Sequence, residues 1–276
     1  MPTTHALEWD ATGQKMYSTG TKEGILYVGS TSAYDPTTDK SAYVAGVAWN
    51  GLTGVTETPS GAEANDNYAD DIKYISIRGA EKFAFTVEAF MAPDEWEVCD
   101  GSRWSKVGTK NIAKFGQQER RPFGMAFKTV LGNDTYKNEN GFDIHLEFNA
   151  TASPSERAYK TIGENPELLT FSWECDADPV AVGESAKAGG ITKPTCNIIV
   201  RCTVDNGVLK SVNGVIGIDT GADAPQQAKN VKLLLDVLQG TTTTMPTLPQ
   251  PDVVYEILNL TGSESKTVAD YAIAAV

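Results

Sequence analysis

Two stretches of the chain alternate apolar and polar residues with a period of two, and this pattern constrains the fold more than any other feature. They are residues 142–148 and 167–176. A β-strand places successive side chains on opposite faces, so this period predicts an antiparallel sheet that is wet on one side. The apolar set is Phe142, Ile144, Leu146, Phe148, Leu169, Phe171, Trp173 and Cys175, and the polar set includes Asp143, His145, Glu147, Glu174 and Asp176.

Further strands and a few helices are predicted elsewhere. A helix at residues 223–239 carries Val231, Leu234, Leu235 and Leu238 on one stripe, which suits packing on a sheet. Shorter helices are expected at residues 93–100, where Trp96 would be the anchor, and at residues 252–258. The fold class is therefore mainly β, with minor helices toward the C-terminus. The other expected strands are residues 23–28, 44–55, 72–78, 82–91, 123–131 and 196–204.

A long polar segment follows the apolar run that contains Trp49. Residues 56–71 are rich in turn formers, and their charged residues are all acidic. We predict a structureless loop, and loops of that length inside a compact domain tend to be functional or to become ordered on a partner. The residues of interest in and beside it are Trp49, Glu57, Pro59, Glu63, Asp66, Tyr68, Asp70 and Asp71.

The charge balance argues against tight nucleic-acid binding. The formal net charge is −13, whereas nucleic-acid affinity comes mainly from Lys and Arg that neutralise phosphates. No apolar run is long enough to span a bilayer, and the N-terminal residues show no signal-peptide pattern. Four cysteines have no zinc-binding spacing and are expected to be free, buried thiols in a reducing cytoplasm: Cys99, Cys175, Cys196 and Cys202.

One basic segment interrupts this acidic chain. Residues 103–128 contain seven basic residues and one acid, Glu119. Such a segment could contact phosphates, but in an acidic chain we favour a surface that pairs with an acidic neighbour. The basic residues are Arg103, Lys106, Lys110, Lys114, Arg120, Arg121 and Lys128.

Little in the sequence indicates catalysis. His145 lies between Asp143 and Glu147 on the polar side of its strand. These three residues could form a divalent-metal site, or His145 could be a general base that the two carboxylates orient. Solvated strand faces look the same, and we favour that interpretation. No phosphate-binding loop, nucleophile elbow or zinc-protease motif is present. We therefore expect a protein without enzymatic activity, metal or cofactor.

Aromatic residues gather in the first quarter of the chain. They could stack on sugars, as in a glycan-binding adhesin that recognises a host surface. They could equally anchor a protein interface, where Tyr and Trp are enriched, and the neighbouring acidic segment favours this alternative. The residues are Tyr27, Tyr34, Tyr43, Trp49, Tyr68 and Tyr74.

Four segments resemble one known family. WNGLTGVTETPSGAEANDNYADDIKY, AEKFAFTVEAFMAPDEWEVCDG, FGQQERRPFGMAFKTVLGNDT and NATASPSERAYKTIGENPELLTFSWE occur in this order. They resemble the major tail tube protein of long-tailed, non-contractile bacteriophages. The resemblance covers residues 5–180 well and residues 193–258 loosely.

The resemblance implies an architecture and a function. The fold would be a β-sandwich or half-barrel of the tail-tube type, with a flanking α-helix. Six copies would form a ring, and rings would stack into the virion's tail tube, through which double-stranded DNA passes into the host without specific binding. The implied partners are other copies of the chain, a tape-measure protein, a tail-tip initiator and a tail terminator. Assembly would take place in the host cytoplasm, without binding to a membrane.

The resemblance also suggests roles for named residues. Residues 56–71 would reach a neighbouring subunit or ring, and we expect them to be disordered in the monomer and ordered in the tube. The facing basic partner would be Arg103, Lys106, Lys110, Arg120 and Arg121. Acids on the wet strand faces would line the bore, although the outer wall of a tube is equally wet. These acids are Glu88, Asp143, Glu147, Glu174 and Asp176.

The domain organisation follows the same comparison. Residues 1–204 would form the tail-tube core, and residues 205–222 look like an insertion that elaborates the outer surface or adds a strand. Residues 223–258 would be a helical part of the same domain, and residues 259–276 a C-terminal tail.

Overall fold

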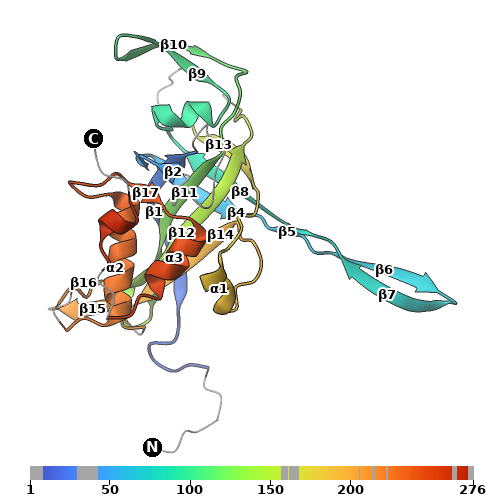
Figure 1. Cartoon of the computed structure of the whole chain (residues 1–276), viewed down its shortest axis with the longest axis vertical. Helices are drawn as coiled ribbons and strands as arrows, with labels where there is room; N and C mark the ends of the chain where they lie inside the picture. The colour runs from blue at the N-terminus through green and yellow to red at the C-terminus, as the bar shows by residue number, and fades with distance from the viewer. Residues whose placement is uncertain are drawn as a thin grey trace, which may run out of the picture.

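The computed structural model is mainly β, as the sequence predicted (Figure 1). It describes residues 9–29, 43–156, 161, 168–204, 206–212, 215–221, 223–262 and 266–272. A curved antiparallel sheet forms the body, helices cover one side of it, and two hairpins project from it in different directions. Within the described residues, no helix is both long and apolar enough to cross a membrane.

The centre of the sheet is the long strand β12 with its neighbours. One edge of β12 pairs with β11, which in turn pairs with β1 and, beyond it, β3. The other edge pairs first with β14 and then, through its last residues only, with β13. The bounds are β1 (Tyr17–Val28), β3 (Val47–Trp49), β11 (Phe123–Asn133), β12 (Lys137–Ala152) and β14 (Asn197–Thr203).

The remaining strands fold back over one face of β11 and β12. They continue the sheet as β13, β8 and β4, and the short β5 also pairs with β8. A first apolar core lies between these strands and β11, and Trp49, Trp96 and Trp173 form its aromatic centre. The bounds are β4 (Leu52–Glu57), β5 (Ser60–Gly61), β8 (Glu81–Ala89), β13 (Phe171–Ala177) and the 3₁₀ helix η1 (Asp94–Val98), which carries Trp96.

A second core covers the opposite face of β12. Leu234 and Leu238 of helix α2 (Gln226–Gln239) belong to the same buried cluster as Ile144 and Leu146, which confirms the predicted stripe. Helix α3 (Pro251–Leu258) packs beside α2, and β17 (Thr247–Leu248) pairs with β2 (Tyr43–Val44). The four cysteines are buried and free, as predicted.

Three segments beyond β13 contain further secondary structure. Residues 205–222 contain a hairpin, β15 (Leu209–Val212) and β16 (Val215–Ile218), and its Leu209 is buried in the second core. The tail contributes the 3₁₀ helix η2 (Val268–Asp270) and the buried Tyr271. Residues 179–190 contain helix α1 (Glu184–Ala188).

The structure corrects the prediction for residues 44–71. The single strand at residues 44–55 is wrong, because the run is divided into β2, β3 and β4 with a turn at Gly51. The structureless loop is also wrong. Its residues complete β4, form β5 and then form β6 (Ala64–Ala69), which pairs with β7 (Ile72–Arg78) in a hairpin. The predicted strand at residues 72–78 is confirmed as β7. We call residues 62–80 the arm, because they project well beyond the body (Figure 1).

Two aspartates explain why the arm escaped prediction. Asp70 and Asp71 form the two-residue turn between β6 and β7, with φ of 52° and 63°. Positive φ at both turn positions gives the twist that a tight hairpin needs, and Asp tolerates that conformation better than most residues. In the sequence, the same residues looked like loop formers.

Candidate functional site

Three of the predicted bore-lining acids share one exposed surface. On the paired strands β8 and β13, Glu88 lies opposite Ser172, and Glu174 lies opposite Thr86. Residues directly opposite each other point to the same side of a sheet, so Glu88, Glu174 and Asp176 lie on the outer face of this pair. All three are exposed. Lys82 forms an ion pair with Asp176 at 3.0 Å on the same surface.

The other two predicted bore-lining acids are buried, so that part of the prediction is wrong. Asp143 is 5% exposed and Glu147 is fully buried. Both lie on the face of β12 that was expected to be wet. The end of β4 lies against this face at Glu147, and the side chain of Arg201 lies against Asp143. Neither residue is available to line a bore in this conformation of the chain.

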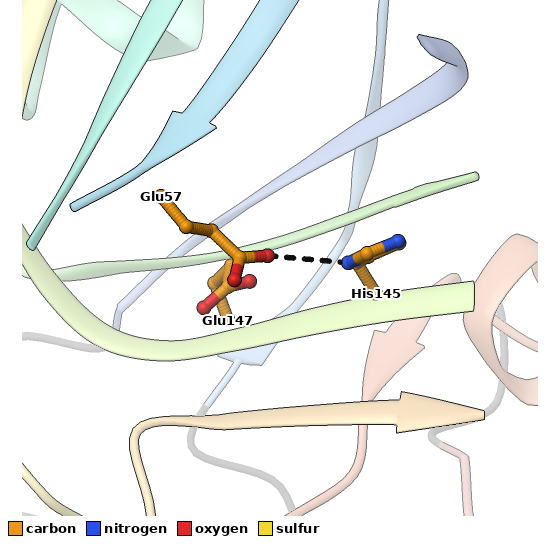
Figure 2. A group of neighbouring side chains, drawn as sticks. All are labelled: Glu57, His145 and Glu147. Carbon is orange, nitrogen blue, oxygen red and sulfur yellow. Dashed lines mark hydrogen bonds and ion pairs between the residues drawn. The ribbon is translucent and has the colours of Figure 1, made fainter. Parts of the chain in front are cut away.

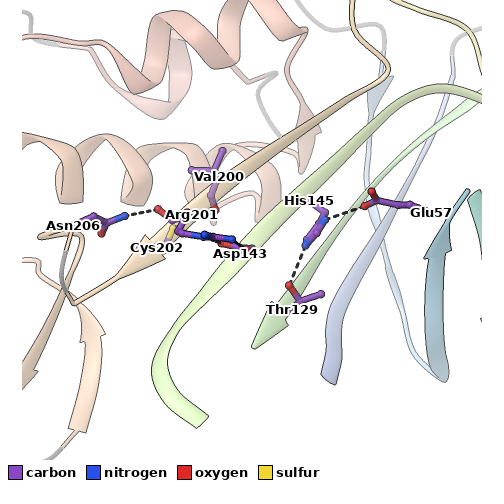
Figure 3. A network of polar contacts seen from close by, with 8 residues as sticks. All are labelled: Glu57, Thr129, Asp143, His145, Val200, Arg201, Cys202 and Asn206. Carbon is purple, nitrogen blue, oxygen red and sulfur yellow. Dashed lines mark hydrogen bonds and ion pairs between the residues drawn. The ribbon is translucent and has the colours of Figure 1, made fainter. Parts of the chain in front are cut away.

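Asp143 has a specific partner on the neighbouring strand (Figure 3). Arg201 of β14 donates from Nε to Oδ1 at 3.0 Å and from Nη2 to Oδ2 at 2.9 Å. Two parallel charge-assisted hydrogen bonds satisfy both carboxylate oxygens, and they raise the pKa of Arg201 further above its usual value. The guanidinium therefore compensates the buried charge of Asp143.

Glu147 faces a different neighbourhood, formed by Glu57 and His145 (Figure 2). The Nδ1 atom of His145 lies 3.3 Å from Oε1 of Glu57, which extends from the end of β4. Burial raises the pKa of Glu147 to about 9, and the negative charge of Glu57 contributes to the same shift. The cluster therefore joins the two layers of the sheet through ionisable groups.

The sequence did not predict this grouping. His145 was expected between Asp143 and Glu147 on a solvated face, whereas Asp143 pairs with Arg201 and Glu57 takes its place. Glu57 is 88 positions away from His145, and no spacing rule connects the two. Only the folding of β4 over β12 brings them together.

The predicted interface residues divide between the core and the surface. Trp49 is wrongly assigned to an interface, because it is 3% exposed and donates from Nε1 to the carbonyl of Met91 at 2.9 Å. Glu57 is partly exposed, and its carboxylate faces His145. The other predicted residues lie on the arm or the β5 segment that leads to it, and all except the partly exposed Asp66 are exposed: Pro59, Glu63, Asp66, Tyr68, Asp70 and Asp71.

Most of the basic residues lie on the second projecting hairpin. Strands β9 (Arg103–Val107) and β10 (Lys110–Phe115) present Arg103, Lys106 and Lys110 to solvent. Arg120 and Arg121 follow in the connection to β11, and Arg121 is only partly exposed. At the base of this basic hairpin, Lys114 forms an ion pair with Glu97 of η1.

The aromatic residues from the first quarter of the chain do not form one exposed surface. Tyr27, Tyr43 and Trp49 are buried, whereas Tyr68 and Tyr74 are exposed on the arm. Tyr34 lies outside the described residues. A sugar-binding platform made of this set would therefore be reduced to the two arm tyrosines.

Comparison with models of known protein families finds no match to this chain, and no curated protein matches its sequence.

Proposed function

We propose that this chain is a self-assembling virion subunit, which forms stacked rings of a phage tail tube for the passage of double-stranded DNA. The observation that carries the proposal is the arm. Tyr68, Ile72 and Tyr74 are 69%, 65% and 75% exposed, and Ile75 and Ile77 are exposed as well. An isolated two-stranded hairpin is at best marginally stable in water, so an arm with this apolar surface is suited to order against a partner.

A second copy of the chain is the partner that the charges favour. The turn of the arm presents Asp70 and Asp71, whereas the basic hairpin presents Arg103, Lys106 and Lys110. The arm and the basic hairpin leave the body on different sides (Figure 1), which disfavours their pairing within one chain. Repeated pairing between copies would generate a ring or a stack of rings.

The exposed acids are consistent with the proposed conduit. Glu88, Glu174 and Asp176 share the outer face of β8 and β13, which no other described element covers. If this face lines the bore, its charge repels DNA phosphates and keeps contacts weak during passage. The hexameric ring and the DNA cargo come from the family resemblance, and the arm supplies the independent support.

The first experiment is electron microscopy of the purified protein over a range of concentrations. We expect rings or hollow striated tubes. Tyr74→Ser with Ile77→Ser should abolish them while the melting temperature stays within about 2 °C of the parent, because both side chains are exposed. The exposed Leu168 of the body provides a matched control, and Leu168→Ser should leave assembly intact.

Charge reversal tests the identity of the partner surface. Asp70→Lys with Asp71→Lys should weaken assembly, and Lys106→Glu with Lys110→Glu should do the same. Mixing the two variants should restore contacts between their changed surfaces. Wild-type tubes formed by both the serine and the charge-reversed variants would contradict the proposed role of the arm, and so would a wild-type protein that stays monomeric throughout.

A further inference from the structure

Three potential metal ligands meet inside the body, away from the arm and the exposed acids. Glu57 comes from the end of β4, and His145 and Glu147 are two residues apart on β12. One ligand atom from each lies within 4.8 Å of the other two (Figure 2). Ligand bonds of about 2.1 Å in a tetrahedral site place neighbouring ligand atoms about 3.4 Å apart. The 3.3 Å between His145 Nδ1 and Glu57 Oε1 matches that spacing.

Glu147 supplies an independent indication of a missing partner. Its side chain is fully buried, and neither carboxylate oxygen has a hydrogen-bond partner among the described residues. The Glu147 carboxylate lies beside that of Glu57, with one of its oxygens on the side of His145 (Figure 2). Buried carboxylates are normally paired or bound to metals, as Asp143 is paired with Arg201 on the same strand. Within the described part of the chain, no Lys or Arg forms an ion pair of this kind with Glu147.

The surroundings of His145 suit a ligand. Its Nε2 atom lies 3.0 Å from the hydroxyl oxygen of Thr129 (Figure 3). Its ring also stacks on Phe127, with ring centroids 4.5 Å apart. When Nε2–H donates to Thr129, Nδ1 keeps a free lone pair that faces the two carboxylates. A second hydrogen bond of this kind orients most metal-binding histidines and fixes their tautomer.

We propose that Glu57, His145 and Glu147 bind one divalent transition-metal ion, with Zn²⁺ as the best match. One imidazole nitrogen and two carboxylates suit Zn²⁺, whereas Ca²⁺ and Mg²⁺ prefer ligands that are all oxygen. Two carboxylates also neutralise a dication, so the bound cluster carries no net charge. The Glu57 side chain is 29% exposed, so solvent reaches its side of the cluster and water would be the fourth ligand.

The ion would serve as a structural clip. It would join the end of β4, where the chain leaves the body toward the arm, to the central strand β12. Since Glu57 is the last residue of β4, the clip would fix the start of the segment that leads through β5 to the arm. This role requires no ring or tube, and its test is separate from that of assembly.

The test is binding of Zn²⁺ to the full chain, purified without a histidine tag and treated with a chelator that is then removed. Calorimetry should give one ion per chain, with micromolar or tighter affinity, and Ca²⁺ should not compete. Glu147→Gln and His145→Ala should each weaken binding at least about 100-fold. Thr129→Val should weaken it about tenfold, as loss of an orienting group does.

Matched controls are available in the chain. It contains two histidines, so His5→Ala is the control for His145→Ala, although His5 lies outside the described residues. The exposed Glu88 provides Glu88→Gln as the control for Glu147→Gln. Both control variants should bind Zn²⁺ as the parent does, and circular dichroism verifies that every variant is folded.

Several outcomes would overturn the proposal. Wild-type protein that binds no Zn²⁺ at 100 µM free ion would do so. Binding that survives in both His145→Ala and Glu147→Gln, or that disappears only after the thiols are alkylated, would assign the ion elsewhere. If Glu147→Gln fails to fold, His145→Ala and the wild-type titration still decide the result.

Discussion

Glu147 on β12 and Glu174 on β13 occupy the same kind of position in the sequence but opposite surroundings in the structure. Each alternates with large apolar residues, and each was expected on a wet face. Glu174 is exposed, whereas Glu147 is fully buried between β12 and the end of β4. The difference arises because β13 has one covered face and β12 has two. A period of two therefore identifies a strand, but not the number of layers around it.

The largest effect on stability is expected from a comparison of substitutions on the two faces of β13. Trp173→Ala should lower the free energy of unfolding by about 3–5 kcal/mol, because Trp173 packs against Trp49 and Trp96 in the first core. Glu174→Ala, one residue away, should change it by less than about 0.5 kcal/mol. Urea unfolding measures both. Similar losses at the two positions would show that β13 is covered on both faces.

A smaller effect is expected at Asp143, the buried acid that has a partner. Arg201→Ala should lower the free energy of unfolding by about 1–3 kcal/mol, because it leaves a nearly buried carboxylate without its cation. Asp143→Asn should cost less, since it leaves behind a guanidinium that is 60% exposed. Urea unfolding of both single variants and the double variant would quantify the coupling. A larger loss for Asp143→Asn than for Arg201→Ala would contradict this interpretation.

When metal is excluded, replacement of Glu147 should not lower stability, in contrast to the loss of stability expected for Arg201→Ala and Asp143→Asn. In excess chelator, Glu147→Gln should leave stability unchanged or raise it by up to about 1 kcal/mol, because a buried carboxylate without partners stabilises nothing. Thermal unfolding with and without chelator provides the measurement, and Glu88→Gln is the matched control. A loss above about 1 kcal/mol in chelator would reveal a stabilising partner for Glu147.

The smallest effect on stability is expected on the outer face of β13. Glu174→Lys with Asp176→Lys should change the free energy of unfolding by less than about 0.5 kcal/mol beyond the loss of the exposed Lys82 pair. In assembled tubes the same change should increase the salt-sensitive retention of short double-stranded DNA, if this face lines the bore. Unchanged retention would place Glu174 and Asp176 on the outer wall.

Much of the body could be predicted from local patterns. The alternation of residues 142–148 and 167–176 identified parts of β12 and β13, and the stripe on residues 231–238 identified the buried face of α2. These predictions succeeded because side-chain periodicity follows directly from backbone geometry. Trp96 was also correctly expected to anchor its short helix, since a large apolar side chain among polar residues is stabilised by burial in the core.

The arm and the buried cluster could not be predicted in the same way. In the arm, consecutive aspartates such as Asp70 and Asp71 are typical both of irregular loops and of tight turns. Only the pairing of β6 with β7 shows that they form a tight turn. In the cluster, Glu57 and His145 come from strands that do not pair with each other. Contacts across layers depend on how far the sheet curls, and no local pattern records that curvature.

The sequence by itself determined the class of fold, the positions of most strands, the apolar face of α2 and the buried state of the four thiols. These properties depend on residue type and on spacing along one element. The tertiary structure decided which polar face stays wet, that residues 62–80 project as an arm, and that Glu57 meets His145 and Glu147. Those outcomes depend on the second layer that covers β12, because the burial of a strand face is set by what packs on it.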